Sequence, residues 1–193
     1  DWDLHHGNGT QHSFYDDPGI LYFSTHQYPY YPGTGSAGEI GRGAGEGYTI
    51  NVPLPRGRGD ADYVKIFKEL LEPVALAYKP ELILVSVGFD ICQGDTLGGM
   101  EVSVQGFANL MRVLMDIADQ CCDGRLAATL EGGYNISMLV KSSKAVLKEM
   151  NGDTRVSDRD LEEVAQGAAI VTGQVLNNVK ERIAPFWPTG TFR

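Results

Sequence analysis

The stretch that decides the fold reads Leu82-Ile83-Leu84-Val85-Ser86-Val87-Gly88-Phe89-Asp90. This short apolar, β-branched run follows a proline at position 80, which ends the preceding helix, and it predicts a strand that is buried on both faces. An aspartate follows close behind the strand. Because open α/β sheets bind ligands at the carboxyl ends of their strands, Asp90 is a candidate site residue.

Helical and strand patterns alternate on both sides of this stretch. Helices are predicted over residues 60–78, where Asp60 and Asp62 offer capping carboxylates, over 101–122, and at about 136–150 and 158–180. Further strands are predicted over 20–25, 48–53 and 125–130. This order predicts an α/β fold with a parallel sheet flanked by helices in three layers. We expect a single domain over residues 1–193, with a tail over 184–193.

Composition narrows the class of protein. The chain has 193 residues, 42% of them hydrophobic, and a net charge of -9, which argues against direct nucleic-acid binding. No apolar run is long enough to cross a membrane, and three cysteines without zinc-finger spacing favour a reduced, intracellular, cytoplasmic protein. The chain begins without Met in what reads as the middle of a strand, so we expect the C-terminal part of a longer protein. The sequence sets no oligomeric state.

Carboxylates and an imidazole recur in the first segment, Asp1-Trp2-Asp3-Leu4-His5-His6-Gly7-Asn8-Gly9. On an extended strand Asp1, Asp3 and His5 would project from one face. Such a set suits a divalent cation such as zinc. Taken alone, the segment also fits a solvated polar strand end.

Three strand ends carry chemistry, and a parallel sheet would bring them together. They hold Asp3 with His5, Asp90, and Gly132-Gly133-Tyr134. Three ligands with a fourth position left open are what a catalytic zinc needs, and a phenol beside it can donate a hydrogen bond to an oxyanion. The alternatives are that Asp90 caps a helix and that Tyr134 is a packed surface aromatic.

A loop over residues 26–47 is unusually rich in tyrosine, proline and glycine. Loops of this length inside a compact domain tend to be functional, and its aromatics could wall a narrow apolar slot. The alternative is a surface loop whose tyrosines cover the core.

Four segments carry a family resemblance: Asp-Trp-Asp-Leu-His-His-Gly-Asn-Gly, Tyr-Tyr-Pro-Gly-Thr-Gly, Gly-Phe-Asp and Leu-Glu-Gly-Gly-Tyr-Asn. In this order, across about residues 1–150, they resemble the histone deacetylase superfamily of zinc amidohydrolases, which includes acetylpolyamine amidohydrolases and acetoin-utilisation proteins. The resemblance implies an arginase/deacetylase-like fold, of which this chain would be the C-terminal portion of the catalytic domain. It also implies one zinc ion on Asp3, His5 and Asp90, and Tyr134 as the oxyanion donor.

Further assignments follow from the resemblance alone. A structural potassium or sodium ion is expected near Asp1, Asp3, the carbonyl of His5 and Ser24, and a second near Phe14, Asp17, Ile20 and Tyr48. The substrate channel would be lined by Tyr31, Leu97, Gly132 and Gly133. Leu97 could instead be a loop residue that packs locally. Asp1 and Asn8 would orient a histidine pair, His6 would be structural, and Asp95 would support its loop.

The expected reaction is hydrolysis of an N-acetyl or other N-acyl amide, with acetate released from the acetyl form. The histidine pair that serves this family as general base is absent, so we expect this chain to be impaired by itself, and the aromatic on the other wall of the channel is missing too. Where polyamine-selective relatives place a glutamate, this chain has Leu97, which favours acetyl-lysine in a protein over an acetylated small amine. The rivals are an acetylpolyamine amidohydrolase, an arginase-like enzyme with two manganese ions, and a non-catalytic zinc-containing module that binds acyl-lysine or a partner.

Overall fold

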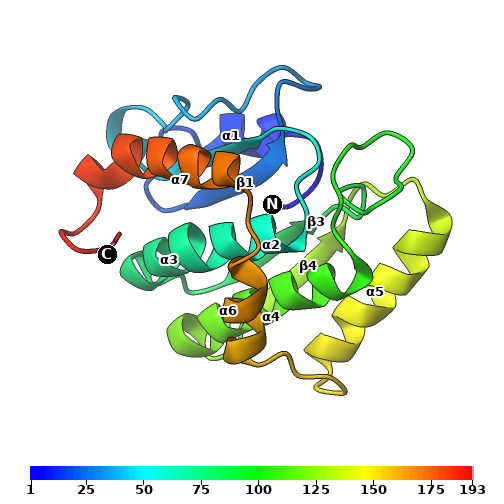
Figure 1. The fold of residues 1–193 in the computed structure, drawn as a ribbon. Helices are drawn as coiled ribbons and strands as arrows, with labels where there is room; N and C mark the ends of the chain where they lie inside the picture. The colour runs from blue at the N-terminus through cyan, green and yellow to red at the C-terminus, as the bar shows by residue number, and fades with distance from the viewer. Residues whose placement is uncertain (193) are drawn as a thin grey trace.

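The computed structural model describes residues 1–192, in which strands and helices alternate as the sequence predicts (Figure 1). The strands are β1 (Tyr22–Gln27), β2 (Thr49–Leu54), β3 (Ile83–Val87) and β4 (Leu126–Leu130). The helices are α1 (Asn8–Phe14), α2 (Asp60–Ile66), α3 (Glu72–Tyr78), α4 (Val104–Cys122), α5 (Ile136–Met150), α6 (Asp158–Ala165) and α7 (Ile170–Ile183). The predicted α/β class is confirmed.

Two parallel strand pairs make up the sheet, β1 with β2 and β3 with β4. The first residues of the chain lie between the pairs. Thr25 N donates to the carbonyl of Asp1 at 3.1 Å, and Trp2 N donates to the carbonyl of Ser86 at 3.1 Å. The spatial order is therefore β2, β1, the N-terminal segment, β3, β4, and this order places the N-terminal segment at the centre of the molecule.

The prediction of a regular strand over residues 1–5 is wrong. The segment is extended at its start and bends at Leu4 and His5. The period-two alternation nevertheless holds in its burial, because Trp2 and Leu4 are fully buried in the core while Asp1 and Asp3 lie along a cleft. The bend turns the His5 ring toward Asp3.

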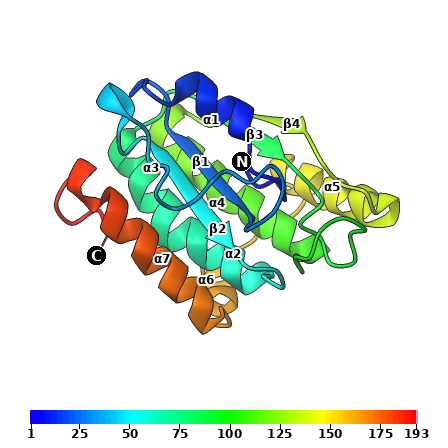
Figure 2. The same cartoon turned by 90° about the horizontal axis from the view of Figure 1, so that it is seen from above.

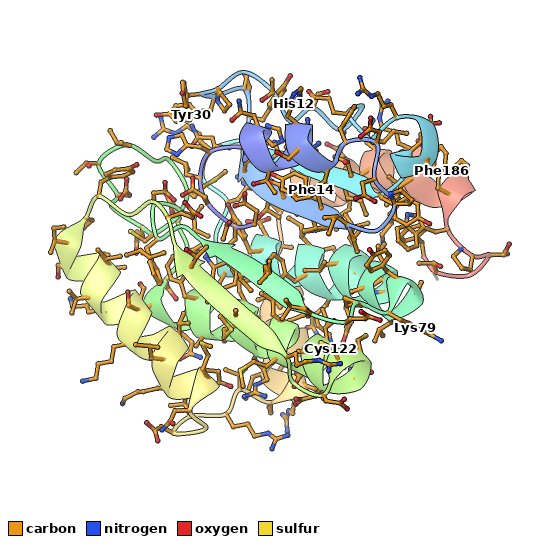
Figure 3. All side chains as sticks on the ribbon, turned by 180° about the vertical axis from the view of Figure 1, so that it is seen from behind. His12, Phe14, Tyr30, Lys79, Cys122 and Phe186 are labelled. Atoms are coloured by element: carbon orange, nitrogen blue, oxygen red, sulfur yellow. The ribbon has the colours of Figure 1, made fainter. Side chains whose placement is uncertain are left out.

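Helices α2, α3 and α4 lie along one side of the strands and bury a core there (Figures 1 and 2). The predicted helix over residues 60–78 is confirmed as one helical run, in which a π-helical segment, Phe67–Leu71, joins α2 to α3. The ring of Phe67 packs 6.3 Å from that of Trp2, and α4 adds Phe107, whose ring lies 5.0 Å from that of Phe89. Helices α1 and α7 lie on opposite sides of β1 and β2 (Figures 1 and 3).

The prediction of one helix over residues 158–180 is wrong. The chain leaves the helical path between α6 and α7, and Asp62 anchors the break. Its carboxylate accepts hydrogen bonds from the backbone of Ala169, at 3.0 Å, and from the hydroxyl of Thr172. This tertiary contact starts a new helix where the sequence pattern alone reads as continuous.

The prediction that residues 82–88 are buried on both faces is also wrong. Leu84 of β3 is 73% exposed and Leu130 of β4 is 62% exposed. Figure 3 shows this face, with β3 and β4 in front and no helix over them. Within residues 1–192 no strand pairs with the outer edge of β4, and an apolar groove between β4 and α5 is lined by residues that include Val140 and Leu147.

The segment expected to form a tail contacts the body of the protein. A 3₁₀ turn spans Ala184–Phe186, and the indole N–H of Trp187 donates to the carbonyl of Gly47 at 3.2 Å. The indole ring packs against the rings of Tyr48 and Tyr78. Among the helices of residues 1–192, none combines the length and apolar character that a membrane crossing requires.

Candidate metal centre

Three predicted ligands meet where the N-terminal segment passes the ends of β3 and β4. One ligand atom from each of Asp3, His5 and Asp90 lies within 4.8 Å of the others. Nδ1 of His5 is 3.1 Å from Oδ1 of Asp3 and 3.3 Å from Oδ2 of Asp90. Residues that are up to 87 positions apart in the chain thus form one cluster.

Backbone hydrogen bonds fix both carboxylates. Oδ1 of Asp90 accepts from Leu4 N at 2.9 Å, so the N-terminal segment itself orients this ligand. Oδ1 of Asp3 accepts from His5 N at 2.7 Å, and its Oδ2 accepts from Gly132 N at 2.8 Å. Backbone N–H groups thus hold each carboxylate beside the His5 ring.

The remaining oxygen of Asp90 tests whether the cluster fits a cation. Asp90 is 0% exposed, and its Oδ2 accepts no hydrogen bond of good geometry within the described part of the chain, although Nδ1 of His5 lies 3.3 Å away. A buried carboxylate oxygen without a partner costs free energy unless a cation satisfies it. Two buried carboxylates and an imidazole on an open cleft therefore fit a divalent ion such as zinc.

Two glycines make room for this cluster. A Cβ on Gly132 would lie 2.1 Å from Oδ2 of Asp90, and a Cβ on Gly88 would lie 2.4 Å from Oδ2 of Asp3. Any side chain at either position would displace a ligand oxygen. The sequence signal for both was a glycine directly after a predicted strand or one residue beyond it.

The charges of the cluster shift the protonation of its members. The hydrogen bond to Asp3 and the close approach of the Asp90 carboxylate raise the pKa of His5 to about 9. Burial raises the pKa of Asp90, helped by the charge of Asp3. Burial also acts to raise the pKa of Asp3, but hydrogen bonds from the His5 ring and from backbone N–H groups hold it below its ordinary value. Without a metal, His5 is an imidazolium that neutralises part of the carboxylate charge.

A cleft of about 460 Å³ runs across the cluster. Its exposed rim includes Tyr31, Leu97 and Tyr134, which are 76%, 50% and 48% exposed. Its polar lining residues include Asp1, Ser86 and Glu131. The predicted channel residues Tyr31, Leu97 and Gly132 thus line the same cleft as Asp3 and His5.

Tyr134 lines this cleft, and its phenol is a candidate hydrogen-bond donor there. Burial of the phenol, together with the negative charges of Asp90 and Asp3, raises its pKa. The hydroxyl therefore stays protonated at neutral pH and can act as a donor. Gly133 before it has φ of +140°, which a glycine adopts without strain.

Tyr30 contacts the cluster, although the sequence analysis did not single it out. Its ring stacks on the His5 ring, with 5.7 Å between centroids, and its hydroxyl donates to the carbonyl of Leu97 at 2.8 Å. Tyr31, which lines the cleft, meets the same imidazole edge-on at 6.0 Å. The signal was the tyrosine pair in the Pro-rich loop, but the sequence could not tell which ring stacks on the imidazole.

A buried polar network supports this loop from behind. His6 lies 2.8 Å from the Thr34 hydroxyl through Nδ1 and 2.9 Å from Oε1 of Gln11 through Nε2. His26 on β1 is fully buried, with Nε2 2.8 Å from the carbonyl of Gly35. Both imidazoles thus hold the segment that follows Tyr31.

The residues of the first predicted monovalent cation site lie near the centre. Oδ1 of Asp1 accepts from Asp3 N at 3.0 Å, and Tyr22 donates to the carbonyl of Gly7 at 3.2 Å beside them. Ser24 is fully buried on β1, and its hydroxyl is 3.0 Å from Nδ1 of His26. Asn8, the other predicted orienting residue, is the first residue of α1 and is exposed.

The residues of the second predicted cation site come from the end of α1 and the loop after it, and from Tyr48 just before β2. Asp17 N donates to the carbonyl of Phe14, and Ile20 N donates to the carbonyl of Asp17, which closes two turns after α1. The carbonyl of Tyr48 accepts from Tyr22 N at 2.9 Å, which places it where β1 begins. Both monovalent cation sites stay predictions.

Comparisons with known proteins agree on one family. The family model of the histone deacetylase domain matches residues 1–150. The chain is 48% identical over 136 residues to a probable deacetylase of Archaeoglobus fulgidus, covering 70% of this chain and 38% of that protein. It is 37% identical over 193 residues to histone deacetylase 15 of Arabidopsis thaliana, covering 98% of this chain and 34% of that protein.

Solved structures show the same likeness. The crystal structure of the HDA15 HD domain matches with a TM-score of 0.86 and 36% identity, covering 97% of this chain and 50% of that one. The structure of the histone deacetylase Clr3 matches with a TM-score of 0.88 and 36% identity, covering 100% of this chain and 32% of that one. The chain thus spans half or less of the length of each of these relatives.

Proposed function

Because the chain belongs to the histone deacetylase family, we propose that it carries the metal-binding part of a zinc-dependent deacetylase that acts on acetyl-lysine in a protein. The observation that carries the proposal is the cluster of Asp3, His5 and Asp90, with the unsatisfied Oδ2 of Asp90 beside an open cleft. These three residues would hold one zinc ion.

Different side chains of this chain would bind the substrate and stabilise negative charge during amide hydrolysis. When bound, zinc would polarise the acetamide carbonyl and make water a better nucleophile. Tyr30, Tyr31 and Leu97 hold the acyl-lysine side chain at the rim, and Tyr134 donates a hydrogen bond to the carbonyl oxygen as negative charge develops there. Water adds to the carbonyl carbon, the C–N bond breaks, and a proton passes to the leaving amine, which gives lysine and acetate.

The general base is the part that this chain does not supply. Of its four histidines, His5 belongs to the metal cluster, His6 and His26 are buried in hydrogen bonds, and His12 is exposed on α1. No unengaged imidazole faces the cleft from residues 1–192. We therefore propose that the 193-residue chain turns over poorly by itself.

Two details favour this proposal over its enzymatic rivals. Leu97 at the rim is apolar, which fits the aliphatic stem of lysine better than the charged chain of a polyamine. After Asp90 come Ile91 and Cys92, both buried in the apolar core, where a second manganese ion would need a carboxylate. Asp3, His5 and Asp90 form the one metal-type cluster found among the described residues.

A second candidate function rests on the same missing imidazole. A chain that keeps the zinc cluster and the aromatic rim but lacks a base would bind acyl-lysine, or a partner that presents it, without hydrolysing it.

We also propose a reducing, cytoplasmic setting, because the three cysteines are all unpaired.

The decisive experiment combines zinc content with chemical rescue. Elemental analysis of the purified chain should find one zinc per molecule, and Asp90→Asn should lose it. In a fluorogenic acetyl-lysine assay, turnover by the zinc-loaded chain should be slow and should rise when free imidazole is added at concentrations that leave the zinc content unchanged. Peptide binding with no turnover under rescue would favour the binding module. Absence of zinc would contradict both the deacetylase and the zinc-containing binding module.

A further inference from the structure

The carboxylate of Asp95 joins the two loops that form the rim of the cleft. Its Oδ1 accepts hydrogen bonds from Leu97 N at 2.9 Å and Gly98 N at 3.2 Å. Its Oδ2 accepts from Tyr134 N at 2.8 Å and Asn135 N at 3.1 Å. One side chain therefore receives four backbone N–H groups, two from each loop.

The same loops are joined at two further points. The side-chain amide of Asn135 donates to the carbonyl of Gly94 at 2.9 Å, and the Tyr30 hydroxyl donates to the carbonyl of Leu97 at 2.8 Å. The peptide groups of Leu97 are thus held on both sides. A hydrogen-bonded arc runs around the rim from Tyr30 through Leu97 and Asp95 to Tyr134.

The backbone before Tyr134 is fixed at Gly132, whose N–H donates to Asp3 and whose carbonyl accepts from Phe89 N. Gly133, with φ of +140°, lies between this fixed point and Tyr134, and the Tyr134 side chain is half exposed. On the other side, Asn135 caps α5 by accepting from Met138 N. The charge-assisted hydrogen bonds that Tyr134 N and Asn135 N donate to Asp95 therefore constrain the Tyr134 backbone directly.

We propose that Asp95 is a positioning residue that holds the Tyr134 hydroxyl at a fixed place relative to the metal cluster. Through the same carboxylate, the position of the Tyr134 loop depends on the position of the Leu97 loop. This inference rests on the proposed function for its catalytic consequence, whereas the coupling of the two loops follows from the hydrogen bonds alone. A carboxylate is required because it accepts on both oxygens. An asparagine offers one oxygen, and its NH₂ group would face an N–H donor.

The coupling is tested without turnover by hydrogen exchange. In Asp95→Asn, amides in peptides covering residues 94–98 and 132–136 should exchange faster together, by about tenfold or more, because each loop loses shared acceptors. The matched control is Asp123→Asn, an exposed aspartate that follows α4 and lies outside this arc. It should leave both peptides unchanged. Faster exchange in only one loop, or throughout the protein, would overturn the coupling.

The catalytic consequence is tested by a double-mutant cycle in the zinc-loaded protein under imidazole rescue. Asp95→Asn should lower kcat with little change in KM, and it should have no further effect on kcat in a Tyr134→Phe background, because it acts through that hydroxyl. Additive losses of kcat would overturn the positioning role. If the wild-type chain shows no turnover, the proposed function fails, while the exchange experiment still decides the coupling.

Discussion

The backbone N–H of Gly132 donates a hydrogen bond to Oδ2 of Asp3 at 2.8 Å across 129 positions of sequence. The segment that follows β4 therefore contacts Asp3, a candidate ligand from the start of the chain, directly. No side chain separates the two, and a Cβ on Gly132 would lie 2.6 Å from that same oxygen. The shape of the metal cluster thus depends on a residue that is not one of its ligands.

If the cluster binds zinc as proposed, Gly132→Ala should weaken that binding without unfolding the chain. The added methyl group displaces Oδ2 of both Asp3 and Asp90, so zinc affinity should fall by at least tenfold, measured by competition with a chromogenic chelator. Gly173→Ala is the control, because nothing lies within 4 Å of a Cβ there. Equal zinc affinity in the two variants would contradict the close fit described for this cluster.

Removal of the metal should destabilise the fold. Zinc at about a hundred times its dissociation constant adds about 2.7 kcal/mol to the free energy of unfolding, which is about 5–10 °C in Tm for a chain of this size. Calorimetry with and without a chelator measures this difference. Asp90→Asn should abolish it, and a variant that kept the full zinc-dependent shift would show that the ion binds elsewhere.

Loss of the Tyr134 hydroxyl should slow the reaction and spare the metal site. Tyr134→Phe removes the donor to the developing oxyanion, so kcat should fall by about a hundredfold or more, as for other oxyanion donors. The zinc content of the variant, measured by elemental analysis, should match that of the wild type. An unchanged rate would remove Tyr134 from the mechanism.

The buried His26 should make the protein sensitive to mild acid. Burial lowers the pKa of His26 from 6.5 to about 4 and outweighs the hydrogen bond to Gly35, which acts to raise it. The nearby His6 lowers this pKa and Glu39 raises it, both to a smaller extent. The unfolded chain then binds more protons between these values, so the free energy of unfolding is full above pH 6.5 and falls by up to about 3 kcal/mol as pH drops toward 4.

Urea titrations at several pH values measure this dependence. His26→Gln should flatten the profile between pH 6.5 and 4. His12→Gln is the matched control, since His12 is exposed at the surface (Figure 3), and it should leave the profile unchanged. A profile that stayed steep in His26→Gln would assign the acid sensitivity to other groups.

Sequence patterns predicted the strands and long helices of the fold because hydrophobic periodicity is a local property. These patterns failed where a tertiary contact determines the local secondary structure. Asp62 breaks the helix at residues 166–169 from 107 positions away, and α1 forms from a short polar segment that carries no amphipathic signal. The exposure of Leu84 was also unpredictable, because an apolar strand reads the same whether its second face is covered or open.

That Asp3, His5 and Asp90 lie together could be predicted, because the extended N-terminal segment and the end of β3 meet at one edge of the parallel strands. The supporting residues could not. The stacking of Tyr30 on His5 and the four hydrogen bonds to Asp95 depend on how two loops meet, and no spacing in the sequence encodes that meeting. The sequence suggested support of a loop by Asp95, but not that a second loop shares it.

The uncovered face of β3 and β4 has a practical consequence for anyone who purifies this chain. Within residues 1–192 the outer edge of β4 pairs with no strand, and it lies beside solvent-exposed leucines. Such an edge is a template on which another copy can add, so the isolated protein should self-associate as its concentration rises. Light scattering over a dilution series would reveal the growth in mass. Leu130→Lys should suppress it, and such a variant would be the better starting material for crystallisation and for every titration proposed above.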